Sequence, residues 1–89
     1  MSRALRPHND VLARAFEGKL VLLHLGTGEY FTLNAIGATV WNSLGSGATE
    51  PEITSRVCAT YETTEEEAAR DVGAFLEMLT ANGLILATE

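Results

Sequence analysis

The sequence predicts an α+β fold, with a small antiparallel sheet in the first third of the chain and three helices in the remainder. Before residue 34, short runs of residues with high strand preference are separated by turns that contain glycine. After residue 34, apolar residues recur at helical spacing, and the segments follow helix-start signals. Segregated runs of strands and helices are typical of α+β domains.

The 89 residues are enough for one domain with a modest core. Residues 1–10 carry no periodic pattern and contain Pro7, Asn9 and Asp10, which are typical of a loop. We therefore predict a flexible N-terminal segment over residues 1–10 and a single domain over residues 11–86. The sequence shows neither a signal-peptide pattern nor an apolar run long enough to cross a bilayer, so we expect a cytoplasmic protein that does not bind membranes.

Three strands are predicted, over residues 11–16, 20–25 and 29–33. The turns at 17–19 and 26–28 are short, so successive strands are expected to pair as an antiparallel meander with the second strand in the centre and the third at an edge. The second strand is apolar on both faces, which favours a central strand that is covered on both sides.

Two helices are predicted in the middle of the chain. Asn34 is suited to cap a first helix over residues 35–44. Thr49 and Glu52 form a capping box, with a proline in the first turn, and they start a second helix that ends near Tyr61. The apolar face of the first helix consists of Ile36, Val40, Trp41 and Leu44.

A third helix is predicted from a second capping box, formed by Thr64 and Glu67, to about Ala81. After a C-cap signal at Asn82, residues 84–86 form an apolar tail, either a strand or a packed extension. Two short helices before a longer one also indicate helix-turn-helix packing with an attached sheet, as in winged-helix domains. The main apolar stripe of the third helix consists of Ala68, Val72, Phe75, Leu76 and Leu79.

The charge balance bears on the class of partner. Six basic and twelve acidic side chains give a net charge of −6, which argues against non-specific nucleic-acid binding because that needs Lys and Arg to displace phosphate counterions. Helix-turn-helix packing leaves DNA binding as a hypothesis. However, Glu65, Glu66 and Glu67 begin the third helix, where phosphate contacts would be needed, and the second helix supplies only Arg56.

No pattern in the sequence predicts catalytic residues, a metal site or a cofactor. His8 and His24 have no acid, cysteine or second histidine at metal spacing. The turn at 26–28 lacks the later glycine and the Lys-Ser/Thr pair of a phosphate loop, and it leads into a strand. Cys58 is the only cysteine, which excludes an internal disulfide and favours a buried thiol. We therefore predict that the protein is not an enzyme.

The third strand is a candidate peptide-binding edge. It contains no proline, and Glu29 is its only charged residue, so it is poorly protected against pairing with another strand. A partner peptide can add to such an edge by β-augmentation. Alternation along the strand places Tyr30 and Thr32 on one face and Phe31 and Leu33 on the other.

The third helix offers a second wall for such a peptide. Asp71, Ala74 and Met78 form a stripe beside the main one, with room at Ala74 and an adaptable apolar contact at Met78. Two alternatives stay open. The stripe could belong to a broad core-facing side, and the tail at 84–86 or another subunit could cover the strand edge. A dimerisation module is a further possibility.

The ordered run over residues 22–34, followed by Gly37 and Trp41, and the later stretch 71–76 resemble PqqD-like proteins. The resemblance extends over about residues 11–86. Such proteins are recognition elements for ribosomally synthesised and post-translationally modified peptides (RiPPs). The resemblance implies a winged-helix-like fold of three strands and three helices. It also implies that the leader region of a precursor peptide binds as a strand beside the third strand and against the third helix, with no chemistry by the protein itself.

The resemblance further implies delivery of the leader to a leader peptidase and to a cyclase or other modifying enzyme. The glycine-containing turn at 26–28 stands where members acting in pyrroloquinoline quinone synthesis usually have a Pro-Glu turn, which favours the free-standing leader-binding proteins of lasso-peptide pathways. The alternatives are a peptide chaperone in pyrroloquinoline quinone synthesis and a DNA-binding winged-helix regulator. We expect a monomer or weak dimer. The implied peptide-binding positions are Glu29, Tyr30, Phe31, Thr32, Leu33, Asp71, Ala74, Phe75 and Met78.

Overall fold

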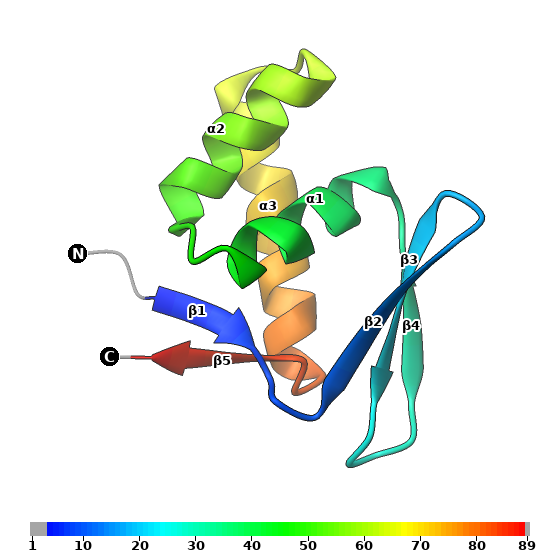
Figure 1. Ribbon diagram of the computed structural model, residues 1–89. Coiled ribbons are helices and arrows are strands. Elements are labelled where there is room, and N and C mark those ends of the chain that lie inside the picture. Colours follow the sequence, from blue (N-terminus) through cyan, green and yellow to red (C-terminus); the bar gives the residue numbers. More distant parts are fainter. Residues whose placement is uncertain (1–3, 89) are drawn as a thin grey trace.

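The structure, a computed structural model, describes residues 4–88 and contains two small sheets and three helices (Figure 1). The three meander strands followed by three helices confirm the α+β class. Within residues 4–88, no helix combines the length and the apolar character needed to cross a membrane. The elements are β1 (Ala4–Pro7), β2 (Val11–Phe16), β3 (Lys19–His24), β4 (Tyr30–Leu33), α1 (Ala35–Gly45), α2 (Glu50–Tyr61), α3 (Glu65–Ala81) and β5 (Ile85–Thr88).

The larger sheet has β3 in the centre, paired antiparallel with β2 and with β4. The predicted meander and the edge position of β4 are therefore confirmed. Leu20, Leu22 and His24 of β3 are buried on the inner face, whereas Val21 and Leu23 on the outer face are only half-buried. The predicted cover on both faces is wrong, because the helices and the β1–β5 pair lie on one side of this sheet (Figure 1).

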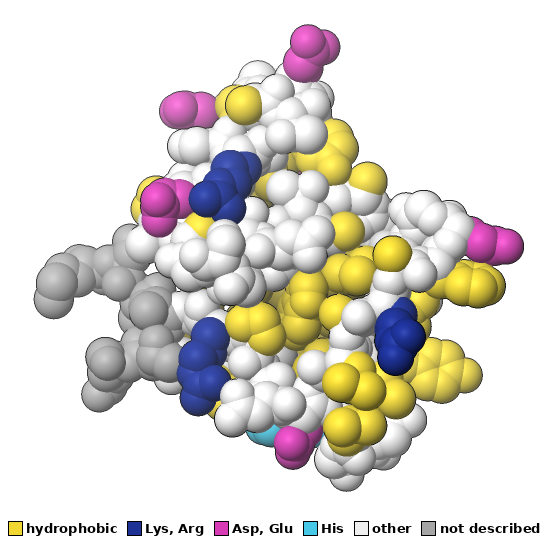
Figure 2. Space-filling model, viewed as in Figure 1, with side chains coloured by type: hydrophobic (Ala, Val, Ile, Leu, Met, Phe, Trp, Pro, Cys, Tyr) yellow, Lys and Arg dark blue, Asp and Glu magenta, His cyan; other side chains and the backbone are white. Residues whose placement is uncertain are grey.

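The helices cover the larger sheet unevenly. Five of the six residues of β2 are exposed, and among them Leu12 and Phe16 are large apolar side chains. Figure 2 shows hydrophobic side chains at the surface over this sheet and between it and the helices. In contrast, α1 packs against both β3 and β4. The helical part of the molecule is therefore fixed to the β3 and β4 part of the sheet.

The smaller sheet joins the two ends of the described chain. β1 pairs antiparallel with β5, with Leu5 opposite Ala87 and Pro7 opposite Ile85. A strand thus stands where the sequence predicts only a loop, because its pairing partner lies far away in the sequence and leaves no local pattern. Pairing does not measure flexibility, so the division into segments 1–10 and 11–86 stays a prediction.

Capping interactions fix the starts of the second and third helices. At α2, the Thr49 side chain accepts a hydrogen bond from the Glu52 N–H, and the Glu52 carboxylate accepts one from the Thr49 N–H, so this predicted capping box is confirmed. At α3, only the half in which Thr64 accepts from the Glu67 N–H is present. The Glu67 carboxylate instead accepts from the Thr63 hydroxyl at 2.7 Å, so the second predicted box is half wrong.

The core lies between the three helices and the inner face of β3 and β4. Trp41 of α1 is buried in it and is its largest aromatic side chain, as predicted. Because α1 contacts both α3 and β4, the core holds α3 at a fixed position relative to the edge strand. The buried apolar residues are Leu20, Leu22, Leu33, Val40, Trp41, Leu44, Ala48, Ile53, Val57, Ala68, Val72, Leu76, Leu79, Leu84 and Ile85.

Candidate functional site

β4 has a free edge within the described part of the chain, since β3 is its only partner there and the apolar tail pairs with β1 instead. The His24 N–H donates to the Glu29 carbonyl at 2.9 Å, which fixes the phase of the β3–β4 ladder. Hydrogen-bonded pairs alternate along antiparallel strands. The alternation directs the N–H and C=O groups of Tyr30 and Thr32 away from β3 and toward the free edge.

The side chains at β4 differ in what they can contact. Tyr30 is 73% exposed on the outer face, and Thr32 and the preceding Glu29 are also exposed. Phe31 is half-buried and packs against the core from the inner face. Leu33 is only 2% exposed, so its side chain belongs to the core and supports the strand from within.

Four of the predicted residues meet on one flank of α3. Asp71, Ala74, Phe75 and Met78 line a cavity of about 360 Å³. Phe75 and Met78 are half-buried against the core, whereas Asp71 and Ala74 are exposed. The stripe formed by Asp71, Ala74 and Met78 therefore extends beyond the core-facing side of α3 to the surface.

Two residues that the sequence reasoning did not assign to the site complete this cavity. Asn34, directly after β4, and Ile36 line it together with the α3 residues. The sequence placed Ile36 on the core face of α1, and Ile36 is half-buried, packs against the core and also borders the cavity. Their position at the end of the edge strand is the signal that could have identified them. No side chain from residues 29–33 lines the cavity, so Asn34 and Ile36 join the strand positions to the helix positions.

Gly37 allows α1 to pack closely against Phe75 of α3 and Leu33 of β4. A Cβ atom at Gly37 would lie 2.7 Å from Cε1 of Phe75 and 3.1 Å from Cβ of Leu33. The Asn34 side chain accepts a hydrogen bond from the Gly37 N–H at 2.9 Å, which caps α1 at the same place. The cap and the glycine together hold the end of β4 against Phe75.

The composition of the cavity determines what it can hold. Asp71 is its one charged lining residue, and Asn34 adds an amide, whereas the remaining lining side chains are apolar. The cavity therefore suits an apolar or aromatic side chain with a hydrogen-bond donor at its rim. Within residues 4–88, no group of three or more His, Cys, Asp or Glu side chains is placed to hold a metal ion.

The two histidines lie together away from this cavity. The ring centroids of His8 and His24 are 5.1 Å apart. The Nδ1 atom of His24 accepts from the Gly26 N–H, and that of His8 accepts from the Asp10 N–H, each at 3.0 Å. Both rings therefore hold neighbouring turns in place.

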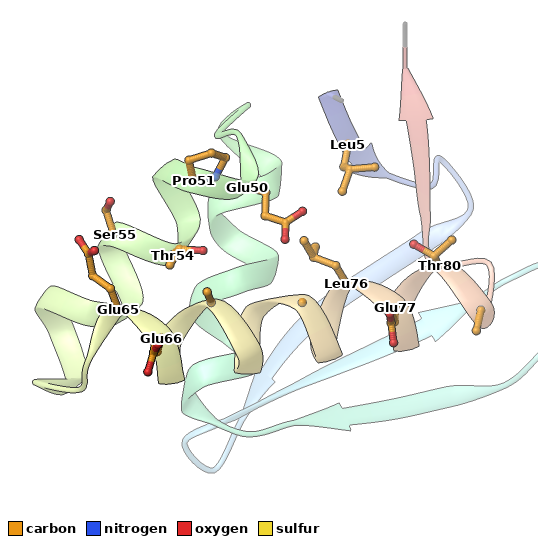
Figure 3. Close-up of a pocket in the computed structure, with 13 residues that line it drawn as sticks. Leu5, Glu50, Pro51, Thr54, Ser55, Glu65, Glu66, Leu76, Glu77 and Thr80 are labelled. Atoms are coloured by element: carbon orange, nitrogen blue, oxygen red, sulfur yellow. The ribbon is translucent and has the colours of Figure 1, made fainter. Parts of the chain in front are cut away.

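A second, larger cavity of about 1180 Å³ lies between α2, α3 and β1 (Figure 3). It shares no lining residue with the first cavity. Its lining includes the carboxylates of Glu50, Glu65, Glu66 and Glu77. Glu65 and Glu66 lie at the start of α3, where the DNA-binding hypothesis needs phosphate contacts, and their charge has the wrong sign for such contacts.

The sequence matches the family model described as coenzyme PQQ synthesis protein D (PqqD) over residues 19–85, and the chain therefore belongs to the PqqD family. The resemblance seen in residues 22–34 and 71–76 is thus confirmed. A comparison with curated proteins found no significant match.

Two solved structures share the fold over nearly their whole length. The structure of TbiB1 in complex with the TbiA(beta) leader peptide is 32% identical, with a TM-score of 0.87, and the match covers 94% of this chain and 98% of that chain. Lasso peptide synthetase B1 complexed with the leader peptide is 26% identical, with a TM-score of 0.86 and coverage of 93% and 98%. The chain is therefore similar in fold and size to two proteins that were solved with leader peptides.

Proposed function

We propose that this protein binds the leader region of a ribosomally synthesised precursor peptide by adding it as a strand to β4, and that it presents the peptide to processing enzymes. The observation that carries this proposal is the free edge of β4 beside a cavity lined by α3. Similarity to two proteins solved with leader peptides supports it. The role is binding and presentation, without catalysis by this chain.

The edge supplies affinity through the backbone. Tyr30 and Thr32 offer N–H and C=O groups to an added strand, and each hydrogen bond contributes about 1 kcal/mol net. Side chains of the added strand point alternately to the two faces of the sheet. Those on the inner face reach toward Phe75 and Met78, and those on the outer face lie beside Tyr30. The cavity therefore selects the leader by its apolar or aromatic anchors.

The pathway that we favour is lasso-peptide synthesis, because one of the two similar structures is named as a lasso peptide synthetase B1. The partners are then a leader peptidase and a cyclase or other modifying enzyme. The name of the matching family model keeps a peptide chaperone in pyrroloquinoline quinone synthesis as the second candidate. The cytoplasmic location and the monomeric or weakly dimeric state stay predictions of this proposal.

The direct test is a titration of the protein into a fluorescein-labelled TbiA(beta) leader peptide, followed by fluorescence anisotropy. This peptide is the natural first probe because it is bound to the protein that is 32% identical. We expect saturable binding. We also expect Met78→Glu to weaken it at least about tenfold, equivalent to 1.4 kcal/mol, because a carboxylate would face the apolar part of the cavity.

The matched control is Ala59→Glu, which adds the same charge to an exposed position of α2 outside both cavities. Its affinity should stay within about twofold of wild type. Circular dichroism establishes that both variants are folded. If folded Met78→Glu binds the leader as tightly as wild type, or if wild type binds a scrambled leader equally well, the site assignment is wrong.

A further inference from the structure

The larger cavity, which we call the acidic groove, is defined by its lining from α2, α3 and β1 (Figure 3). Ala69, Gly73 and Leu76 of α3 belong to its lining, and Leu5 closes one end from β1. Figure 3 shows the Glu50 side chain reaching from α2 into the space above Leu76. The groove thus combines apolar surface with carboxylates, and its lining contains no Lys or Arg within residues 4–88.

Helix electrostatics account for only part of this charge. Glu50, Glu65 and Glu66 lie in the first turns of α2 and α3, where carboxylates stabilise the positive end of the helix dipole. Glu77 lies in the last third of α3, far from its N-terminus, so the helix dipole does not stabilise this carboxylate. The groove therefore holds one carboxylate, that of Glu77, which the electrostatics of the helix ends do not explain.

Gly73 gives an independent reason to expect a close partner. It lies in the middle of α3, where glycine destabilises a helix relative to alanine. A Cβ atom built on Gly73 would meet no atom within 4 Å, so the packing of this chain does not require a glycine. Glycine is favoured where a second molecule must approach a backbone closely. Gly73 is half-buried and lines the groove.

We propose that the acidic groove binds a basic segment of a partner protein, with Lys or Arg side chains whose aliphatic stems lie over Gly73 and Leu76 and whose cationic heads meet Glu50, Glu66 and Glu77. Long basic side chains bury their stems on apolar surface and keep their charge at the rim, which is the chemistry that this groove matches. The complementary charges give selectivity and a fast encounter.

The acidic groove stays available when a peptide occupies β4. Its α3 residues and those of the β4–α3 cavity lie on opposite flanks of the buried stripe formed by Ala68, Val72 and Leu79. The two surfaces share no residue. A partner in the groove and a leader on β4 can therefore be bound at the same time, and each can be measured without the other.

The test uses the whole protein and a fluorescein-labelled synthetic peptide with three Lys-Ala-Ala-Lys repeats, with a Glu-for-Lys version of the same length as the negative probe. We expect anisotropy to report saturable binding of the basic probe only, and to weaken as salt is added. Glu66→Lys combined with Glu77→Lys should weaken binding at least tenfold. Gly73→Leu should weaken it at least fivefold, because its side chain would fill the floor.

The matched control combines Glu17→Lys with Glu62→Lys, which changes the net charge equally at exposed positions outside the groove. This control should bind the basic probe within twofold of wild type, and all variants should retain their circular dichroism and their leader binding. Wild type that does not bind the basic probe overturns the proposal. So does a control variant that loses as much binding as the groove variant, which indicates general charge attraction. Unchanged binding of the basic probe by Gly73→Leu would contradict the proposal. So would spermine, a flexible polyamine, if it bound as tightly as the basic probe, because the groove would then attract any cation without contacting a peptide over Gly73.

Discussion

At the scale of single residues, Gly37 controls the distance between α1, α3 and the end of β4. Its missing Cβ leaves room for the Phe75 ring, which would otherwise be 2.7 Å away. Gly37→Ala should gain about 1 kcal/mol of helix propensity but lose about 1–3 kcal/mol to overpacking. We expect a net loss of stability and weaker leader binding, because Phe75 lines the cavity and must move.

Gly73→Ala is the matched control, since it makes the same substitution in a helix where the new methyl group meets no atom within 4 Å. It should raise the unfolding free energy by up to about 1 kcal/mol and leave leader binding unchanged. Urea denaturation of both variants measures the difference. Gly37→Ala with stability above wild type would contradict the tight contact with Phe75.

A second residue-scale prediction concerns the pH dependence of stability at the start of α2. The Thr49 backbone N–H donates a hydrogen bond to the Glu52 carboxylate, and this bond is the main cause that holds the pKa of Glu52 below its ordinary value of 4.5, with a smaller contribution from a hydrogen bond to the Thr49 side chain. A carboxyl group with a lowered folded-state pKa contributes stability above its unfolded-state pKa, and this contribution is lost as pH falls through the folded-state pKa.

Glu52→Gln removes this titration but keeps a side chain that can complete the capping box. Wild type should therefore be the more stable protein at about pH 6, and its advantage should shrink as the pH falls toward about 3. Urea midpoints across this range check it. A constant difference between the two proteins would mean that the Thr49–Glu52 contact does not respond to pH.

At the scale of elements, β4 makes a prediction that separates its two edges. The Thr32 N–H points to the free edge, whereas the Phe31 N–H points to β3, according to the phase set by His24 and Glu29. Proline is tolerated in an edge strand where the lost N–H faces outward. Thr32→Pro should therefore keep the fold and weaken leader binding by about five- to tenfold, through one lost hydrogen bond and the bulk of the ring.

Phe31→Pro serves as the contrasting variant, because it removes a bond inside the ladder and should lower the melting temperature markedly. Anisotropy with the leader peptide and thermal melts followed by circular dichroism distinguish the two effects. Leader binding that survives Thr32→Pro without change would show that the peptide does not pair along this edge.

The same elements show what local sequence can and cannot specify. The start of α2 was predictable because Thr49 and Glu52 are three residues apart and satisfy each other. β1 was not, because Leu5 pairs with Ala87 at the other end of the chain. The edge of β4 followed from chain order and short turns, whereas the cavity depends on how α1 and α3 pack. Ile36 was therefore assigned to the core, although it also borders the cavity.

At the scale of the whole molecule, the modest core makes stability responsive to binding. A ligand that binds only the folded state at 100 times its Kd adds about 2.7 kcal/mol to the unfolding free energy. For a domain of this size, that corresponds to a rise in Tm of about 10–20 °C.

The two cavities lie on opposite flanks of α3 and share no lining residue. The shifts in Tm produced by the leader and by the basic probe should therefore add, since sites without shared partners behave independently. Differential scanning fluorimetry with each ligand alone and with both together measures this. A second ligand that produces no further shift after the first has saturated the protein would show that the two surfaces compete or that α3 moves between them.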